Sequence, residues 1–374
     1  MKRILLLLMA AGILPAAQPV FSLPAPASIT ITNPSGTARN EEVVEIPYQQ
    51  VSSFAAKDGN FRLINKQTGK EVPYQLAYEG NEQPKWLLVQ VSVPAHGIVI
   101  LNAAAGKPVA VKARTYGRYV PERKDDFAWE NDRMAFRMYG KALENFPAEN
   151  AHGIDVWAKR TTDLVVDRWY KVNDYHHDNG QGLDYYHVGL TLGGGDIAPF
   201  INDSIYYPLH YRTWKVLDNG PLRTTFQLGY EAWQAGNTRV TVVKIISLDA
   251  GSQLNKMSIQ YSENIPVVTG IVKRPEQGSM LLDEKSGVVG YWEPQHGEDG
   301  IIGLGMIMPA HNNLMLVTKQ HLLAKGDASG REPYIYYAGA AWNKAGRFTT
   351  ATQWFAYLQA FAEKLQQPLL VKVN

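Results

Sequence analysis

The chain has 374 residues, of which 45% are hydrophobic and 19% charged, and this excludes a wholly disordered chain. The 37 basic residues nearly balance the 35 acidic ones, so the charge pattern gives no reason to expect binding to nucleic acid. There is no cysteine, which excludes thiol catalysis and thiolate metal sites.

The first residues have the order of a secretory signal peptide. Lys2 and Arg3 precede an apolar run, and small residues and prolines follow. The run has about eleven residues, too few to cross a bilayer comfortably. No cysteine follows it for lipid attachment, and no later segment reaches the length of a membrane span. We therefore expect a signal peptide at residues 1–22 and a periplasmic or secreted protein that does not insert into the membrane.

Residues 28–112 are predicted to form a small β-sandwich domain. Short β-branched runs recur there at intervals of about ten to fifteen residues, separated by Gly, Pro, Asn and Asp. Residues 113–126 are charged and weakly periodic, and we interpret them as a linker. Extended runs then resume, among them DLVVDRWYKV and YYHVGLTLG, at a density that favours a large antiparallel sandwich over residues 127–374.

One segment near the C-terminus is clearly helical. Thr350 or the threonine before it can cap the helix, and Pro368 ends it. Apolar residues share one face at helical spacing, namely Trp354, Leu358, Phe361 and Leu365. The predicted fold class is therefore all-β, with a small sandwich followed by a large two-sheet antiparallel sandwich and one C-terminal helix.

The densest group of titratable residues is DYHHDNGQGLDYYHVG, at positions 174–189. In an extended segment His176 and Asp178 share one side, and the neighbouring histidine faces away. If the glycines of the stretch turn the chain, Asp184 and Tyr186 come back toward His176. A histidine beside a carboxylate suits general acid–base catalysis, the same pair can hold a divalent metal, and a purely structural hydrogen bond is the third interpretation.

A second group of candidates lies in YYPLHYR. Tyr207, His210 and Arg212 are available there as proton donors or anion binders. A proline next to Tyr207 indicates an edge strand or a bend. A structural role for the group is equally consistent with the sequence.

Two further runs, DVWAKR and ENDRMAFRMYG, offer cations. Lys159 and Arg160 point to opposite faces of a strand, so only one of them can face a cleft. Arg133, Arg137 and Tyr139 alternate along one face and would form a cationic, aromatic strip. Exposed surface pairs are the alternative for both runs.

Several stretches together resemble a bacterial family of polysaccharide-utilisation loci that is catalogued as a domain of unknown function. The stretches are WENDRMAFRMYG, DVWAKR, WYKVNDYHHDNGQGLDYYHVGLTLGGG and NGPLRTTFQLGY. The likeness runs from about Ser28 to the C-terminus, and its most specific part is the run from Tyr175 to Asp184. The family is similar to the galactose-mutarotase-like β-supersandwich group, which also supplies domains of many polysaccharide lyases. One relative, linked to ulvan breakdown, is described as an oligosaccharide dehydratase.

The resemblance implies an exported enzyme that acts by β-elimination, as a dehydratase or lyase, on uronate-containing oligosaccharides from pectin or ulvan. Such a reaction needs a base for the C5 proton, an acid for the leaving group and a cation beside the carboxylate. The residues assigned to catalysis are His176, Asp178, Tyr207 and Lys159. The residues assigned to substrate binding are Arg133, Tyr139, Asp184, Tyr186, His210 and Arg212.

No cofactor is expected, except that a divalent metal at His176 and Asp178 stays open, and the expected partner is an oligosaccharide. The oligomeric state is left open by the sequence. A glycoside hydrolase or sugar epimerase on the same fold is one alternative function. A non-catalytic glycan-binding protein is the other, because aromatic residues make up 11% of the chain and aromatic rings stack on sugar faces.

Overall fold

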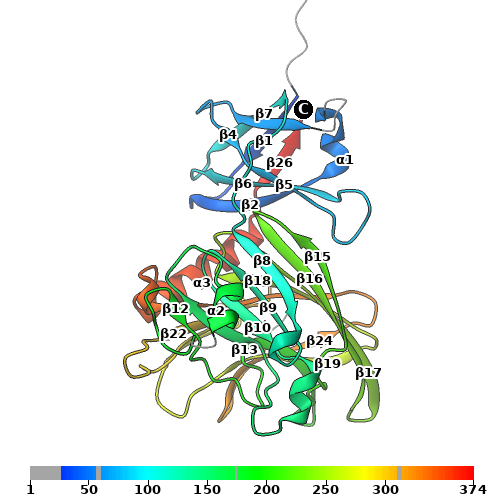
Figure 1. Cartoon of the computed structure of the whole chain (residues 1–374), viewed down its shortest axis with the longest axis vertical. Helices are drawn as coiled ribbons and strands as arrows, with labels where there is room; N and C mark the ends of the chain where they lie inside the picture. The colour runs from blue at the N-terminus through cyan, green and yellow to red at the C-terminus, as the bar shows by residue number, and fades with distance from the viewer. Residues whose placement is uncertain (1–26, 56–59, 173–174, 310–313) are drawn as a thin grey trace, which may run out of the picture.

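The computed structural model describes residues 27–55, 60–172, 175–309 and 314–374. The predicted signal peptide, residues 1–22, lies outside these ranges. A small domain is stacked on a larger one along the long axis of the molecule (Figure 1). The strand pairs are antiparallel, and the described residues contain three α-helices, which confirms the all-β fold class.

The small domain is a sandwich of two sheets. The five-stranded sheet has the order β26 (Leu370–Val373), β1 (Ser28–Thr32), β7 (Ile98–Ala105), β3 (Phe61–Asn65) and β4 (Glu71–Val72). The three-stranded sheet has the order β2 (Arg39–Pro47), β6 (Trp86–Val93) and β5 (Tyr74–Ala77). Alternate residues of β1 and β6 are buried between the sheets, as the period of two requires. The short helix α1 (Tyr48–Val51) follows β2.

The small domain includes the C-terminal strand of the chain. β26 pairs with β1, with Val371 opposite Ile31, so the chain returns to the first domain after the large one (Figure 1). The predicted boundary of 127–374 is therefore wrong at its end. A four-residue strand paired with a segment some 340 residues away carries no local signal of its partner.

The predicted linker is also wrong. Residues 113–126 contain β8 (Thr115–Val120), which pairs along its whole length with β9 (Asp126–Asn131). Thr115 and Val120 are buried, and Arg118 forms ion pairs with Asp167 and Glu122. The charged residues that suggested a linker therefore lie on one side of an edge strand.

The large domain is a sandwich in which one layer is a single eight-stranded sheet. Its strands are β15 (Thr213–Asn219), β16 (Arg223–Ala235), β17 (Thr238–Asp249), β18 (Leu254–Tyr261), β25 (Tyr334–Trp342), β22 (Ile302–Ile307), β21 (Val288–Trp292) and β20 (Ser279–Asp283). The other layer is divided into two five-stranded sheets. One has the order β12 (Gly182–Leu183), β11 (Asp155–Lys159), β10 (Ala135–Met138), β9 and β8. The other has the order β14 (Ser204–Ile205), β13 (Gly194–Ile201), β19 (Ile265–Val272), β24 (His321–Ala328) and β23 (Met315–Val317). The main core takes residues from all three sheets.

The C-terminal helix is confirmed as α3 (Ala351–Gln366). The Thr350 side chain accepts a hydrogen bond from the Gln353 backbone N–H at 3.3 Å, which is an N-cap. Trp354, Leu358 and Phe361 are buried, as the spacing predicts. None of the helices in the described ranges combines the length and the apolar character needed to cross a membrane.

Two runs that were predicted as strands are not strands. DLVVDRWYKV contains α2 (Val166–Val172), in which Val166, Trp169 and Tyr170 recur at helical spacing and are buried. The run YYHVGLTLG is irregular. A short helix with β-branched residues is easily mistaken for a strand, because its tertiary contacts rather than its propensities stabilise it.

Candidate functional site

The candidate site lies on the outer face of the sheet formed by β8 to β12. Along β9, β10 and β11 the apolar side chains point into the sandwich, among them Trp129, Phe136 and Val156. The alternate positions point outward and include several charged residues, namely Asp126, Glu130, Arg137, Asp155 and Lys159. The helix α2 and the segment that follows it pack on this face through the aromatic residues Trp157, Trp169 and Tyr175.

At one end of this face Lys159 and Glu130 form a buried ion pair. Lys159 Nζ lies 2.5 Å from Glu130 Oε2 and donates to the Asn131 carbonyl oxygen at 2.7 Å. Both side chains are fully buried. Glu130 also accepts hydrogen bonds of 2.8 Å from the backbone N–H groups of Val165 and Val166, and so caps the first turn of α2. Burial lowers the pKa of Lys159, and Glu130 opposes that shift.

The assignment of Lys159 as the cation for a substrate carboxylate is therefore wrong. Its ammonium is inaccessible and already has a carboxylate and a carbonyl as partners. Its position on β11 points it under α2, and the next residue along the chain is the exposed one.

The other end of the face has more carboxylates than cations. Arg137 Nη2 lies 2.5 Å from Asp155 Oδ2 and 3.3 Å from Asp184 Oδ2, and Arg137 Nη1 lies 3.7 Å from Asp126 Oδ2. Burial raises the pKa of Asp126 to about 7, against the attraction of Arg137. Burial and the negative charge of Asp155 raise the pKa of Asp184 well above its usual range. Burial therefore favours the protonated forms of both Asp126 and Asp184.

Aromatic rings enclose the Arg137 guanidinium. Its Cζ lies 4.9 Å from the ring centroid of Tyr139 and 5.5 Å from that of Trp157. Arg123 forms a hydrogen bond to the Tyr175 hydroxyl and so adds a second cation at this end. Burial raises the pKa of Tyr139, which is therefore neutral. Two of the predicted binding residues, Tyr139 and Asp184, thus meet at Arg137.

The glycines of the 174–189 stretch turn the chain back on itself, as the sequence predicts. Gly182 has φ of 129° and pairs with Lys159, and a Cβ there would lie 2.0 Å from the Ala158 carbonyl oxygen. Only glycine fits this approach of the two strands. The backbone N–H of Asp184 then donates to the Tyr175 carbonyl oxygen at 2.8 Å.

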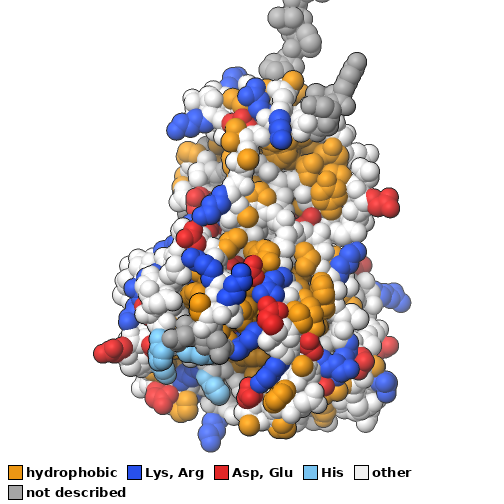
Figure 2. Space-filling model, in the orientation of Figure 1, with side chains coloured by type: hydrophobic (Ala, Val, Ile, Leu, Met, Phe, Trp, Pro, Cys, Tyr) orange, Lys and Arg blue, Asp and Glu red, His pale blue; other side chains and the backbone are white. Residues whose placement is uncertain are grey.

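His176 lies at the solvent end of the cluster. Its Nδ1 is 2.9 Å from the Asp184 carbonyl oxygen and 3.9 Å from Asp184 Oδ2. Its side chain is 58% exposed, whereas that of Asp184 is 4% exposed. Figure 2 shows histidine side chains gathered on this face of the large domain, in the region where Figure 1 labels β12. His176 therefore lies between the solvent and the buried carboxylates, and its hydrogen bond is to the backbone of Asp184.

Asp178 does not orient His176, which corrects its predicted role. It forms an ion pair with Arg160, and its Oδ1 accepts backbone hydrogen bonds from Gly180 and Gly182 at 2.9 and 3.2 Å. Among the residues that the structure describes, no set of three or more His, Cys, Asp or Glu is arranged to hold a metal ion. Arg160 Cζ lies 4.7 Å from the ring centroid of Trp342, and the Arg160 side chain is 33% exposed.

Tyr186 contacts a different arginine. Its ring lies 4.7 Å from Arg274 Cζ, and Arg274 pairs with Glu293 at 2.5 Å and donates to the His187 carbonyl oxygen at 2.8 Å. Tyr185, next along the chain, stacks on His296 with ring centroids 5.2 Å apart. The residues after Asp184 thus continue the site along the loop. The rings of Tyr185 and His296 lie at its edge, and Tyr186 is buried next to them.

Tyr207, His210 and Arg212 form a separate group. The Tyr207 ring stacks on His152 at 4.9 Å, and Arg212 pairs with Glu144 at 2.8 Å. Burial lowers the pKa of His210 to about 4, which keeps its imidazole neutral. In the described ranges none of the three contacts the Arg137 end, so the predicted pairing of Tyr207 with His176 is not what the structure shows.

Arg133 is also remote from Arg137, because its Nη2 pairs with Glu41 of the small domain at 3.0 Å. The residues that sequence reasoning missed are Asp126 and Asp155, and Arg137 was placed in a surface strip rather than at the centre. The available signal was the alternation on β10, which puts Arg137 on the same face as Tyr139. Asp126 was hidden because it fell at the end of the supposed linker.

The fold resembles part of two larger proteins of known structure. It is similar to a crystal structure of a protein in the Glycosyl Hydrolase Family 38 from Enterococcus faecalis, with a TM-score of 0.53, 11% identity and 93% of this chain covered. An alpha-mannosidase from the same organism gives a TM-score of 0.52, 10% identity and the same coverage. The chain spans about half the length of these two proteins, 47% and 46%. At such identities the likeness shows the fold alone.

The chain belongs to the family described as Domain of unknown function (DUF4861), which its residues 31–371 match. It is 31% identical over 294 residues to Uncharacterized protein P7 from Formosa agariphila, a match that covers 74% of each chain. Membership of a domain-of-unknown-function family, predicted from the motifs, is thereby confirmed. The relation to an ulvan oligosaccharide dehydratase stays a prediction.

Proposed function

We propose that the protein is an exported carbohydrate-active enzyme, periplasmic or secreted, that acts by acid–base β-elimination on uronate-containing oligosaccharides. The observation that carries the proposal is the exposed imidazole of His176, beside the buried cluster of Arg137, Asp126, Asp155 and Asp184. An accessible base beside ionisable groups is an arrangement that supports acid–base elimination.

His176 is the base. A carbonyl oxygen only accepts hydrogen bonds, so Nδ1 carries the proton shared with the Asp184 carbonyl and Nε2 keeps its lone pair. Nε2 removes the C5 proton of the uronate, the electron pair of that C–H bond forms the C4=C5 double bond, and the C4–O bond breaks. The leaving oxygen takes the proton that Nε2 removed from C5 and departs as water or as an alcohol, which returns His176 to its neutral form. General acid–base help of this kind contributes about 10²–10⁴-fold.

Arg160 is the residue that supports binding of the substrate carboxylate. The Arg137 guanidinium is buried and already pairs with Asp155 and Asp184, so it offers the substrate carboxylate no free edge. Arg160 is accessible and is stacked on Trp342. Among the residues that the structure describes, its one ion pair is with Asp178, on the same loop as His176. An arginine of this kind binds a carboxylate through two parallel hydrogen bonds.

Spectroscopy on defined substrates tests the proposal. The protein is incubated with oligogalacturonides and with ulvan-derived oligosaccharides, and with neutral oligosaccharides as the control. We expect absorbance near 230 nm, from a C4=C5 bond conjugated to the carboxylate, together with the loss of water or of a sugar unit by mass. Neither signal from any uronate substrate would overturn the proposal.

Glycoside hydrolysis is the second candidate, because Asp126 and Asp184 are two carboxylic acids with raised pKa at one site. Hydrolases use such a pair about 5–9.5 Å apart. New reducing ends without absorbance at 230 nm would favour this reaction. A changed sugar stereocentre without either signal would favour an epimerase, and binding without turnover would favour a glycan-binding protein.

A further inference from the structure

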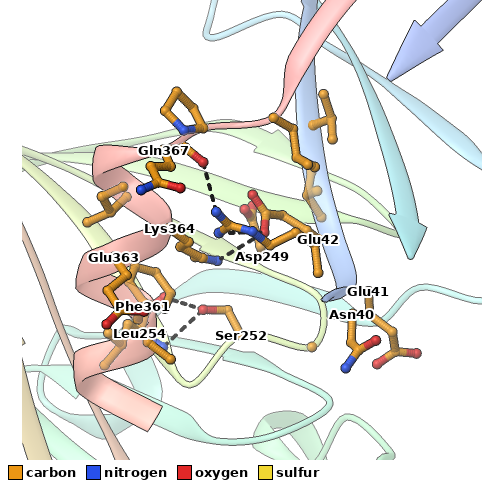
Figure 3. A pocket seen from close by; sticks show the side chains of 18 of the residues that line it. Asn40, Glu41, Glu42, Asp249, Ser252, Leu254, Phe361, Glu363, Lys364 and Gln367 are labelled. Atoms are coloured by element: carbon orange, nitrogen blue, oxygen red, sulfur yellow. Dashed lines mark hydrogen bonds and ion pairs between the residues drawn. The ribbon is translucent and has the colours of Figure 1, made fainter. Parts of the chain in front are cut away.

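A cavity lies between the two domains, lined by residues outside the His176 loop. It has a volume of about 780 Å³ and is lined by β2 of the small domain, by the turn between β17 and β18, and by the last turns of α3 (Figure 3). Small-molecule sites in proteins occupy roughly 300–1,000 Å³ and prefer domain interfaces. The cleft therefore has the size and the position of a ligand site.

Arg39, on β2, is the cation of this cleft with the most unpaired hydrogen-bond donors among the described residues. Its side chain is 5% exposed, and its Nη2 donates to the Gln367 carbonyl oxygen at 2.7 Å. Its Nε and Nη1 have no hydrogen-bond partner in the described ranges, and the nearest carboxylate, Glu42, is 3.7 Å from Nη1. Buried donors of a charged group are expensive to leave unpaired, so an acceptor from a ligand would stabilise this guanidinium.

A second cation shares the same carboxylate. Lys364 reaches from α3 toward Glu42, and its Nζ lies 3.8 Å from Glu42 Oε2 (Figure 3). Burial lowers the pKa of Lys364, and the negative charges of Glu42 and Asp249 oppose that shift. Arg39 and Lys364 thus carry two positive charges against one negative charge.

The other charges of the cleft are balanced. Arg223 pairs with Asp249 at 2.5 Å and also with Glu45, and Lys256 lies 4.0 Å from Glu45. Glu363 is exposed on α3 and makes no ion pair within the described residues. Glu41, the remaining acid of the lining, lies within ion-pair distance of Arg114 and Arg133 outside the cleft. Beside Arg39, two cations therefore share only the carboxylate of Glu42, which leaves room for one monoanionic group.

Aromatic rings adjoin the two cations. Lys364 Nζ lies 4.0 Å from the ring centroid of Phe361, whose ring is 5.3 Å from that of Tyr337 and 6.1 Å from that of Tyr357. All three rings line the cleft. Rings of this kind pack against the apolar faces of sugars, while charged groups hold their acidic substituents.

We propose that the interdomain cleft is a binding site for an acidic sugar unit, with Arg39 and Lys364 holding its carboxylate or sulfate ester. A carboxylate and a sulfate ester both place a singly charged oxyanion on a sugar ring. The site draws residues from both domains, so ligand binding would also hold the small domain against α3. It does not rest on the proposed function, because a ligand would bind here even if the His176 site had no turnover.

Calorimetric titration of the full chain tests this inference. The probes are digalacturonate, a disaccharide sulfate ester and a neutral galactose disaccharide, and the binding of each is measured on the parent and on His176→Ala. We expect one or both acidic probes to bind, with equal affinity in these two proteins, and the neutral probe to bind at least about tenfold more weakly. The acidic probe that binds with the higher affinity shows whether the site prefers a carboxylate or a sulfate ester.

Substitutions locate the binding. Lys364→Gln is expected to weaken binding of the acidic probe at least about tenfold, and Lys372→Gln, at an exposed lysine outside the cleft, is expected to leave it unchanged. Arg39→Lys provides a second test, since lysine keeps the charge and loses the paired donors. Unchanged affinity in both cleft variants, or affinity lost only in Arg160→Gln, would overturn the inference, as would the failure of every acidic probe to bind the parent.

Discussion

The two ends of the outer face of the β8–β12 sheet carry the same kinds of residue and differ in charge balance. At one end Lys159 and Glu130 are matched one to one, and the carboxylate also caps α2. At the other end Arg137 faces three carboxylates, and two of them have a raised pKa. Matched charges under a helix stabilise a fold, whereas an excess of acids beside the exposed His176 supports proton transfer.

The comparison teaches that burial alone does not identify a functional charge. Lys159 and Asp155 are equally buried, and both lie on β11. Around Lys159 the charges cancel. Around Asp155 the acids outnumber the arginine that they face, and the exposed His176 lies beside them. The following substitutions separate the two ends, from the largest expected effect to the smallest.

Lys159→Met should destabilise the protein most. It leaves Glu130 buried without its cation, and breaking a buried pair in this way costs about 3–5 kcal/mol of unfolding free energy. Denaturant unfolding measures the loss. Adding Glu130→Gln should restore part of it, because glutamine still presents an oxygen to the first turn of α2. Lys171→Met, at an exposed lysine of α2, is the control. Parental stability together with lost turnover would show that Lys159 acts in catalysis after all.

Asp126→Asn should change how stability depends on pH. The folded chain has a pKa of about 7 for Asp126, while an unfolded aspartate titrates near ~3.9. Between these values the folded state keeps a proton that the unfolded state has released. The contribution of Asp126 to the unfolding free energy therefore falls as the pH rises from about 4 to about 7, by at most about 1.4 kcal/mol per pH unit.

Denaturation at several pH values reveals this contribution as a difference between the parent and Asp126→Asn. The variant should gain stability over the parent as the pH rises through this window. Glu276→Gln, at an exposed acid, should follow the parent. Parallel curves for the parent and Asp126→Asn would contradict the raised pKa and, with it, the excess of acids at the Arg137 end.

Arg160→Gln should have the smallest effect on the fold and a selective effect on the turnover of uronate substrates. Its ion pair with Asp178 is partly exposed, and such pairs contribute about 0–1 kcal/mol. The kcat/KM for a uronate oligosaccharide should fall at least about tenfold, through a higher KM and a lower kcat, because the arginine holds the carboxylate on which negative charge builds as the C5 proton leaves. Arg168→Gln, on the exposed side of α2, is the control. An unaltered kcat/KM would remove Arg160 from the substrate site.

Much of the fold could be predicted from the sequence. The alternation of apolar residues, the turn residues and the spacing of Trp354, Leu358 and Phe361 are local signals, and they predicted the all-β class and α3. The return of β26 to β1 could not be predicted, because strand pairing over such a separation depends on the tertiary arrangement. The helix α2 was missed for the same reason, since Glu130 caps it from another strand.

The site could be predicted only in part. The glycine turn and the meeting of His176 with Asp184 follow from local chain geometry. The pairing of Asp178 with Arg160, and the choice of Arg160 over Lys159 as the exposed cation, depend on which face α2 covers. Asp126 and Asp155 gain their role from Arg137 on a neighbouring strand, and a single sequence does not show which residues lie opposite each other across strands.

The central claim, that His176 is the base of an elimination, is tested most directly by comparing two neighbouring histidines. The initial rate of absorbance increase near 230 nm is measured for the parent, His176→Ala and His177→Ala on one uronate oligosaccharide. Both side chains are exposed, so both variants should keep the stability of the parent. We expect His176→Ala to lose about 10²–10⁴-fold in rate and His177→Ala to retain the parental rate. Equal rates in the two variants would contradict the claim.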